Sequence, residues 1–253
     1  HVYFNIINPK KTKANYMVRY HYQYDPNDDI FNSSYYLSDK MAIDLTDIGI
    51  EEGQKYEGIY TTMSRDGVKN AAPIGIVCKG KDKLGCRLFV GTKTLKNIME
   101  TRKYVVNITF DPINFVNSTI GNLDIEEFTD DGDIAILKNA EAYIICDVTD
   151  IRKMDPIKDH VTSNGEAYII SSDVVEIVKN NPCAKALNRG VFALLECLAN
   201  YTRLDLVSKK QQDYFVGRFN ENNRMIKRVS GPDTIKAMEI LKNSMVEKGF
   251  DVE

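Results

Sequence analysis

A change of periodicity near residue 175 divides the chain into two parts of different architecture. Before it, from Tyr56 onward, short alternating apolar and polar runs are separated by turn residues, which is typical of antiparallel strands. After it, apolar residues recur at helical spacing. Because runs of strands followed by runs of helices indicate an α+β protein, we expect an antiparallel β-barrel followed by a C-terminal helical subdomain.

The strand-rich part opens with a hairpin. Residues 56–64 lead to the turn Arg65-Asp66-Gly67, and residues 68–78 return. A short helix is expected over residues 94–102, and an acidic loop over residues 124–133 precedes the last strands. The other expected strands are residues 86–90, 104–109, 140–148 and 166–171.

Three helices are expected after the change of periodicity. Asn181-Pro182 resembles a helix start, and residues 184–204 are apolar at helical spacing. Ser208 to Gln211 forms a capping box for a second helix, Pro232 opens a third, and Gly249 ends it. The predicted domains are a Tyr-rich N-terminal arm over residues 1–41, a split barrel over residues 42–178 and a three-helix subdomain over residues 179–253. The arm is either an aromatic surface for a partner or a segment docked on the body, and we favour the docked segment.

Charge and length exclude several classes of protein. The chain has 253 residues, and its net charge of -3 is not typical of a nucleic-acid-binding protein. No apolar run reaches the roughly 18 residues of a membrane span, and no signal-peptide core is present at the start of the sequence. We therefore expect a cytoplasmic protein with no nucleic-acid or membrane partner.

The cysteines and histidines show no metal-ligand or catalytic spacing. No CxxC pair occurs and the histidines are scattered, so we expect neither a metal site nor a Ser-His-Asp hydrolase. Free thiols are the expectation for an intracellular chain, with a disulfide between Cys78 and Cys86 as the alternative. The residues concerned are Cys78, Cys86, Cys146, Cys183, Cys197, His1, His21 and His160.

The returning strand of the hairpin is interrupted by a run of unusual composition: Asn70, Ala71, Ala72, Pro73, Ile74 and Gly75. Pro lacks an N–H group and is confined to strand edges and bulges, while Gly inside a strand marks a close backbone approach. The two alanines leave a shallow surface on which a planar ring system would lie, held by free backbone groups. A plain edge strand with a bulge is the alternative interpretation.

Gly91, Thr92, Lys93 and Thr94 open the predicted short helix. The first N–H groups of a helix are unpaired and lie at the positive end of its dipole, so they form an anion site. The threonines add hydroxyl groups, Lys93 adds a charge, and Asn97 lies one turn further on. Plain N-capping by Thr94, with the lysine in solvent, is the alternative.

Asn107 lies in the apolar strand over residues 104–109. A buried amide without hydrogen bonds costs about 1–3 kcal/mol, so this side chain needs partners. It bonds either a ligand or a neighbouring turn.

These segments together resemble a known family. The motifs are Asn-Ala-Ala-Pro-Ile-Gly at residues 70–75, Gly-Thr-Lys-Thr-x-x-Asn-Ile at residues 91–98 and Val-Val-Asn-Ile-Thr-Phe-Asp-Pro at residues 105–112. Together with Asn-Arg-Gly-Val at residues 188–191, they are similar to uncharacterised archaeal proteins of the FMN-binding split-barrel superfamily. That superfamily also includes pyridoxamine-phosphate oxidase and flavin reductases. The resemblance covers residues 42–250.

The resemblance implies a homodimer of split barrels with FMN near the subunit interface. Residues 70–75 would border the isoalloxazine ring. Thr92, Lys93 and Thr94 would hold the phosphate, with Asn97 and Asn107 nearby. The family often has Ser at the position of Thr92, and Thr keeps the hydroxyl group.

Arg189, Glu196 and Arg203 recur every seven residues and form a charged stripe on an apolar stretch. Arg189 either reaches a flavin phosphate or anionic substrate, or the stripe forms salt bridges to the barrel or a second subunit. We favour the salt bridges.

Two functions fit this sequence, an FMN-dependent oxidoreductase of unknown substrate and a non-enzymatic flavoprotein that carries electrons or binds flavin. No catalytic acid or base stands out, and no GxGxxG motif marks a nicotinamide site. A split barrel that binds the deazaflavin cofactor or heme is a third hypothesis, and heme lacks a well-placed axial ligand. A partner-binding domain that acts through its Tyr-rich arm is the last.

Overall fold

The structure is a computed structural model that describes residues 43–129, 132–155 and 166–253. The predicted Tyr-rich arm, with His1 and His21, and the loop around His160 lie outside the described residues. Among the described residues, no helix has both the length and the apolar character needed to cross a membrane.

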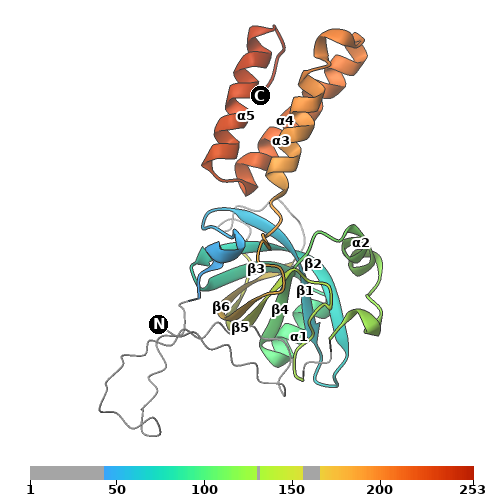
Figure 1. The fold of residues 1–253 in the computed structure, drawn as a ribbon, viewed down its shortest axis with the longest axis vertical. Coiled ribbons are helices and arrows are strands. Elements are labelled where there is room, and N and C mark those ends of the chain that lie inside the picture. Colours follow the sequence, from blue (N-terminus) through green and yellow to red (C-terminus); the bar gives the residue numbers. More distant parts are fainter. Residues whose placement is uncertain (1–42, 130–131, 156–165) are drawn as a thin grey trace, which may run out of the picture. The chain divides into compact units, whose positions relative to one another are not determined.

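Six antiparallel strands close into a barrel in the order β1-β2-β3-β6-β5-β4 (Figure 1). The predicted fold class, an antiparallel barrel followed by a helical subdomain, is confirmed. The strands are β1 (Lys55–Met63), β2 (Lys69–Gly80), β3 (Lys83–Phe89), β4 (Lys103–Ile108), β5 (Ala142–Lys153) and β6 (Ala167–Lys179).

The predicted hairpin is formed by β1 and β2. Their register runs from Met63 opposite Lys69 to Lys55 opposite Val77. Gly67 in the connecting turn has a φ of +80°, a left-handed conformation that glycine adopts without strain. The Asp-Gly turn therefore fixes which residues of the two strands lie opposite each other.

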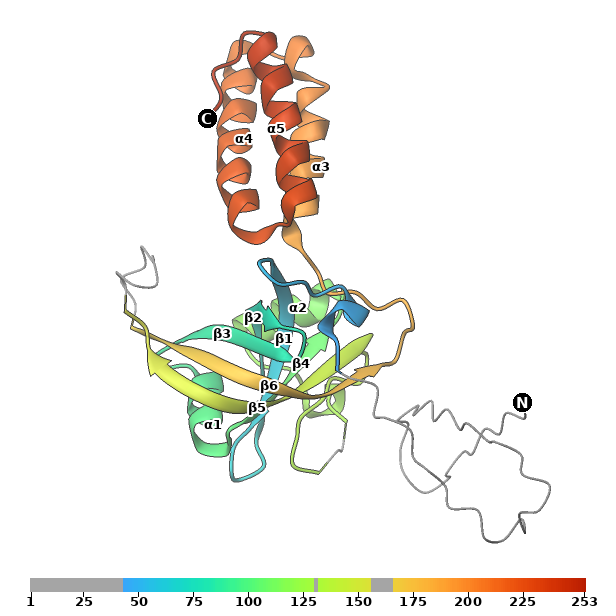
Figure 2. The same ribbon diagram turned by 90° about the vertical axis from the view of Figure 1, so that its left-hand side faces the viewer.

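β5 and β6 extend much further than predicted (Figure 2). Their pairing contains two register shifts, one between Ile145 and Cys146 and one between Val148 and Asp150. Such bulges interrupt the alternation of faces and bend the strands. The extra residues of β5 are largely exposed and polar, so they lack the apolar alternation that identified the rest of that strand. The extra residues of β6 are mostly buried or half-buried, and half of them are apolar.

The described residues of the barrel part contain two α-helices. The first, α1 (Lys93–Thr101), starts one residue before its predicted position. The second, α2 (Pro112–Ile120), was not predicted, although Asp111 caps it and Pro112 occupies its first position. The remaining short elements are the 3₁₀ turns η1 (Leu45–Ile48), η2 (Ile125–Glu127) and η3 (Leu204–Leu206).

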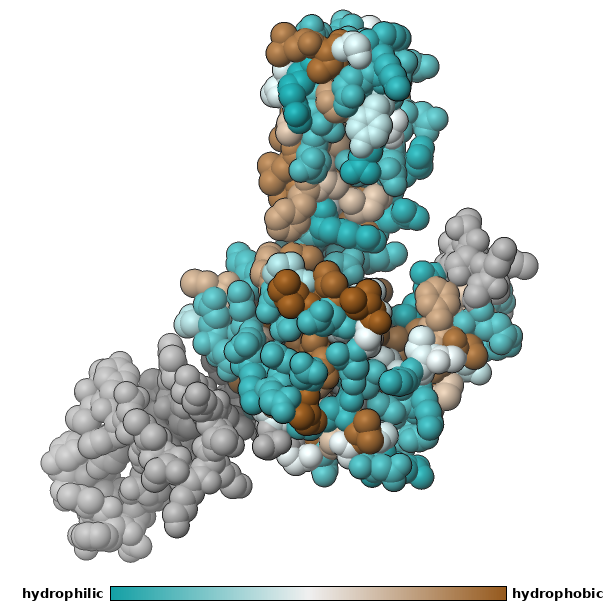
Figure 3. Space-filling model, turned by 90° about the vertical axis from the view of Figure 1, so that its right-hand side faces the viewer, coloured by the Kyte–Doolittle hydropathy of each residue, from teal (hydrophilic) through white to brown (hydrophobic). Residues whose placement is uncertain are grey.

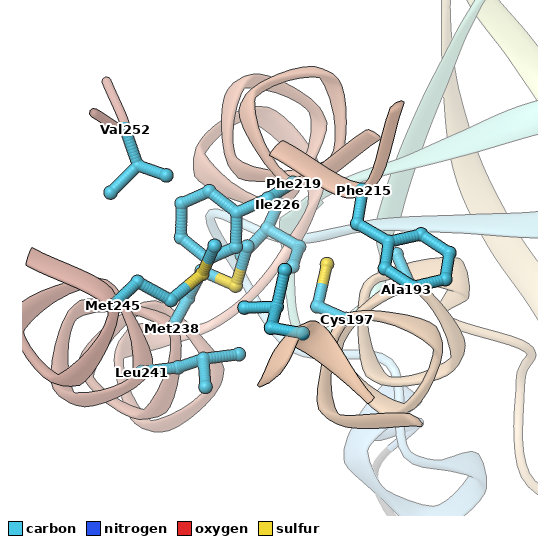
Figure 4. Close-up of a cluster of buried hydrophobic side chains, with 10 residues drawn as sticks. Ala193, Cys197, Phe215, Phe219, Ile226, Met238, Leu241, Met245 and Val252 are labelled. Carbon is cyan, nitrogen blue, oxygen red and sulfur yellow. The ribbon is translucent and has the colours of Figure 1, made fainter. Parts of the chain in front are cut away.

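Three helices complete the chain: α3 (Arg189–Tyr201), α4 (Lys209–Val229) and α5 (Pro232–Glu247). Ser208 caps α4 by accepting a hydrogen bond from the amide of Gln211, which is one of the two bonds of the predicted capping box. The helices pack around an apolar core (Figure 4). Its buried members include Phe215, Phe219, Met238, Leu241 and Met245.

The prediction of a helix start at Asn181-Pro182 was wrong. Asn181 instead forms a turn, in which its side-chain oxygen accepts from the amide of Cys183 and its carbonyl accepts from the amide of Ala184. The helix begins seven residues after Pro182, because Asn188 caps the amide of Gly190 at 2.9 Å. The apolar alanines between these positions carry no information about which of the two asparagines is the cap.

Candidate functional site

The strand predicted to lie along a ring system has an open edge. β2 pairs with β1 along residues 69–77, but its pairing with β3 begins only at Val77. Backbone groups of a strand alternate between its two sides. Because Val77 pairs with β3, the backbone groups of Ala71, Pro73 and Gly75 also point to that side, where no strand of the described residues is paired.

This geometry explains Pro73. The missing N–H group of proline would remove a ladder hydrogen bond if it pointed to β1, but at this position it points to the open edge. Gly75 is exposed, while Ala72, Pro73 and Ile74 are half-buried. The edge strand and its unpaired backbone groups are therefore present in the described part of the chain, apart from one end. The bulge of the alternative interpretation does not occur at these residues, because the register with β1 is regular from Lys69 to Val77.

At that end the side chain of Asn122 takes the place of a neighbouring strand. Its Oδ1 accepts from the amide of Ala71 at 3.2 Å, and its Nδ2 donates to the carbonyl of Lys69 at 3.3 Å. The carbonyls of Ala71 and Pro73 and both backbone groups of Gly75 remain on the open edge. We define the open edge of β2 by these three residues.

The start of α1 leaves helix amides unpaired. Gly91, at a φ of +88°, turns the chain into the helix, and Thr92 is the N-cap residue. The Oγ1 of Thr92 accepts from the amide of Leu95 and donates to the carbonyl of Phe89. Within the described residues, the amides of Lys93 and Thr94 then have no backbone partner. Such amides at the positive end of a helix favour an anion.

The alternative of plain N-capping by Thr94 is not realised, because Thr92 is the N-cap and Thr94 lies inside the helix. It is buried, and its Oγ1 accepts from the Nδ2 of Asn70 at 3.1 Å. Lys93 is exposed and forms no ion pair with the described residues, so its ammonium group is free to meet an anion.

A buried polar cluster joins α1 to the hairpin. The Nδ2 of Asn97 donates to the Oγ1 of Thr62 at 3.0 Å, and the Nδ2 of Asn70 lies 3.5 Å from the same oxygen. Thr62 and Asn70 are register partners on β1 and β2. Together with the bond from Asn70 to Thr94, these contacts define the Thr62 cluster: Thr62, Asn70, Thr94 and Asn97.

Asn107 is placed elsewhere, inside the fold. Its side chain is fully buried, and its Nδ2 donates to the carbonyl of Ile59 and to the Oγ1 of Thr61, both at 2.9 Å. Its Oδ1 accepts from the amide of Leu137 at 3.0 Å. All hydrogen-bonding groups of this amide are therefore used to join β4 to β1 and to the loop before β5.

Arg189 lies at the other end of the strand pair. Its Nε is 3.1 Å from a carboxylate oxygen of Glu57, which is opposite Gly75, whereas Thr62 is opposite Asn70. Glu57 and Thr62 are five positions apart on β1, or about 17 Å along a strand. The structure therefore brings Asn70, Thr94 and Asn97 together and separates Arg189 from them. Arg189 forms the predicted salt bridge to the barrel, whereas Glu196 and Arg203 form none with the described residues.

Burial raises the pKa values of several ionisable groups in the barrel. The pKa of the Glu57 carboxyl is raised because the group is partly buried, an effect that the charge of Arg189 opposes. Inside the barrel, Tyr60 and Tyr104 stack at 5.1 Å, and burial raises the pKa of both hydroxyls well above their ordinary value. Burial also raises the pKa of the Cys86 thiol to about 12.

The cysteines supply no reactive group to this region. All five are free, and Cys78 lies opposite Leu84 in the β2–β3 ladder, so the alternative of a disulfide between Cys78 and Cys86 is not realised. Burial likewise raises the pKa of the Cys146 thiol far above its ordinary value, which keeps it protonated. In the portion that the structure describes, no His, Cys, Asp or Glu side chains form a cluster that would hold a metal ion.

Two residues that take part in this arrangement were not identified from the sequence. Thr62 enters through its register with Asn70, and Asn122 enters through a loop that follows α2. The Asp-Gly turn gives the first signal, since counting outward from it places Thr62 opposite Asn70. Nothing local to Asn122 indicates its role.

The fold and this site define a class: an antiparallel six-stranded barrel with an open strand edge beside a helix start that favours an anion. The family model described as "Protein of unknown function (DUF447) N-terminal domain" matches residues 56–180. The model of the C-terminal part of the same family matches residues 188–243. The chain therefore belongs to the DUF447 family.

Several solved structures are similar to this chain. An FMN-bound DUF447 protein from Methanosarcina mazei is 29% identical, with 79% of this chain and 100% of that chain covered and a TM-score of 0.47. A putative flavin reductase with a split-barrel domain from Shewanella frigidimarina is 17% identical, with coverages of 51% and 68% and a TM-score of 0.39. Flavoredoxin from Methanosarcina acetivorans is 12% identical, with coverages of 56% and 76% and a TM-score of 0.41.

Proposed function

We propose that this protein binds FMN along the open edge of β2 and acts as a flavin-dependent oxidoreductase. The observation that carries the proposal is the direct hydrogen bond from Asn70 on β2 to Thr94 in the first turn of α1. It joins a strand with unpaired backbone groups to a helix start with unpaired amides. A flat polar ring with a phosphate tail needs these two features side by side.

Membership of the DUF447 family supports the same ligand. The Methanosarcina mazei protein, described as an FMN-bound member of that family, extends over both parts of this chain. The segments that carry the candidate site, residues 70–75 and 91–97, lie inside the matched N-terminal domain.

The chain's own groups divide the binding work between two ends. The carbonyl oxygens of Ala71 and Pro73 accept hydrogen bonds and the N–H of Gly75 donates one, which suits the polar edge of an isoalloxazine ring. The amides of Lys93 and Thr94, with the ammonium group of Lys93, suit the phosphate. The bound flavin supplies the hydride or electron transfer, and the protein orients it. Arg189, paired with Glu57, remains a candidate for the Gly75 end of the site.

We further propose a cytoplasmic homodimer. Ile113, Val116 and Ile120 form an apolar stripe on α2, and their exposed fractions are 63%, 53% and 80%. The face that carries α2 shows brown patches among the polar surface (Figure 3). An exposed stripe of this kind on a helix is typical of an interface. The unpaired thiols support a reducing compartment.

The stripe gives a direct test of the dimer. Ile113→Glu should convert a dimer into a monomer in light scattering at micromolar concentration, because a charge cannot be buried there without a partner. Ile240 on α5 has the same exposed fraction of 63%, so Ile240→Glu is the matched control and should leave the dimer intact. A wild-type protein that is monomeric, or an Ile113→Glu variant that stays dimeric, would contradict this interface.

A non-enzymatic flavoprotein is the second candidate function. The most strongly shifted pKa values belong to buried tyrosines and cysteines of the barrel core, which do not lie at the open edge. Glu57, opposite Gly75, also has a raised pKa, but its carboxyl is paired with Arg189. Catalytic acids and bases usually have shifted pKa values and an accessible position. Oxidation of reduced nicotinamide or of a reduced deazaflavin by the flavin-loaded protein distinguishes an enzyme from a carrier.

The first experiment is purification without added cofactor, followed by visible absorption and mass analysis of any released chromophore. A yellow protein that releases FMN supports the proposal. A protein that is colourless and also fails to bind added FMN contradicts it. Release of the deazaflavin cofactor would keep the site and change the ligand.

A further inference from the structure

We propose that Thr62 is a positioning residue that holds the helix start of α1 in register with the open edge of β2. This inference rests on the proposed binding of FMN and assigns a role to a residue that touches neither end of the ligand. Thr62 is buried at 1% exposure. Its hydroxyl oxygen accepts a hydrogen bond from the Nδ2 of Asn97 at 3.0 Å and lies 3.5 Å from the Nδ2 of Asn70.

The contacts fix α1 at two points one turn apart. Asn97 is bonded to β1 through Thr62, and Thr94 is bonded to β2 through Asn70. Thr94 and Asn97 are three residues apart, so they lie on the same face of the helix. Two attachments on one face prevent the helix from sliding along the hairpin or rotating about its own axis.

The side-chain amides of Asn70 and Asn97 both point to one atom, the hydroxyl oxygen of Thr62. Both N–H groups of the Asn70 side chain are engaged, one toward Thr62 and one toward Thr94. Without the Thr62 hydroxyl, one side-chain N–H of Asn70 loses its acceptor. Within the described residues, the side-chain amide of Asn97 loses the only acceptor that it has. Both amides would then reorient, and the first turn of α1 would shift with them.

Loss of these hydrogen bonds would affect binding of the phosphate end of FMN and not of its ring. The amides of Lys93 and Thr94 at the helix start would lose their alignment with the phosphate, whereas the backbone groups of Ala71, Pro73 and Gly75 are held by pairing of β2 with β1. Thr62 therefore determines how strongly the protein prefers FMN over riboflavin, which has the same ring without the phosphate.

The test compares the dissociation constants of FMN and riboflavin for the apoprotein of each variant. Thr62→Val keeps the shape of the side chain and removes its hydroxyl. We expect FMN binding to weaken about tenfold, the equivalent of one misaligned hydrogen bond to a charged group, while riboflavin binding changes less than about twofold. Thr62→Ser retains the hydroxyl and should restore the preference.

Thr61 offers a matched control on the same strand. It is equally buried, but its hydroxyl bonds the carbonyl of Ala135 and receives a hydrogen bond from Asn107, on the other face of β1. Thr61→Val should destabilise the fold without changing the preference for FMN. Asn97→Ala removes one attachment of α1 in a helix-favouring way, so it replaces Thr62→Val if that variant does not fold.

Three results overturn the positioning role. A wild type that prefers FMN together with a Thr62→Val variant that retains the preference shows that α1 is held without Thr62. An equal loss of preference in Thr61→Val shows a general effect of destabilisation. A wild type that binds neither flavin overturns the proposed function and this role together, and it is recognised because the failure is already present before any substitution.

Discussion

The barrel part and the three-helix subdomain both bury apolar side chains, but buried polar side chains are more numerous in the barrel part. In the barrel part, Asn107, Thr61 and the Thr62 cluster are buried and joined by side-chain hydrogen bonds. In the helical subdomain, the core is formed by Phe215, Phe219 and other apolar groups (Figure 4). A hydrogen bond specifies direction and partner, whereas apolar packing specifies volume. The stability of the barrel should therefore depend strongly on its buried hydrogen bonds, and the stability of the helical subdomain on the volume of its buried apolar side chains.

The largest effect is expected where volume is removed from the helical core. Phe219→Ala should lower the free energy of unfolding by about 3–5 kcal/mol, because it leaves a cavity at a position that is 2% exposed. Urea unfolding followed by far-UV circular dichroism measures this. Phe219→Leu, which keeps apolar character and most of the volume, is the comparison and should cost clearly less. Equal losses for the two variants would show that volume does not govern this core.

The next effect tests polarity in the barrel. Asn107→Leu keeps a similar shape and should lower the free energy of unfolding by about 2–4 kcal/mol, because the amide of Leu137 and the carbonyl of Ile59 lose their partner. The same urea titration measures the loss. Asn243→Leu, at an exposed position on α5, is the control and should change stability by less than about 0.5 kcal/mol. If Asn107→Leu were neutral, the contrast between the two regions would be wrong.

The smallest effect concerns the ion pair between the barrel and α3. The pKa of the Glu57 carboxyl lies above its ordinary value of 4.5, mainly because of burial. Since the folded state then holds the proton more tightly, the contribution of Glu57 to stability falls as pH rises through the window just above 4.5. Glu57→Gln removes that dependence.

The stability of Glu57→Gln relative to wild type should therefore rise across this pH window. The carboxyl is partly exposed to solvent, so a change below about 1 kcal/mol is expected. Thermal unfolding at a series of pH values measures it, with Glu196→Gln on the exposed face of α3 as control. A difference that is constant with pH, or that falls, would exclude the raised pKa.

Much of the fold could be predicted because its signals are local. The Asp-Gly turn fixes the β1–β2 hairpin, and Ser208 and Pro232 mark the starts of α4 and α5. The start of α3 could not be chosen from sequence, since Asn181 and Asn188 are equally good caps. The hydrogen bond from Asn188 to the carbonyl of Val229, 41 residues later, identifies the cap only after the chain has folded.

The candidate site was predicted in part for the same reason. Asn70 and the 91–97 segment stand out through their residue types, and the structure brings them together. Thr62 and Asn122 belong to the arrangement through strand register and loop placement, which no short motif encodes. Asn107 could not be assigned from the sequence, because a polar residue in an apolar strand indicates that it has hydrogen-bond partners but not which ones. Its partners are all in the chain itself.

The position of Pro73 also bears on how the protein avoids aggregation. An unpaired strand edge is a template on which another extended chain can add. At the open edge of β2 the Pro73 position offers no donor, and Asn122 occupies the Ala71 end, so an incoming strand would find an interrupted ladder. The residues that leave backbone groups of β2 unpaired therefore also make this edge a poor template for another polypeptide, so the edge can stay open without promoting aggregation.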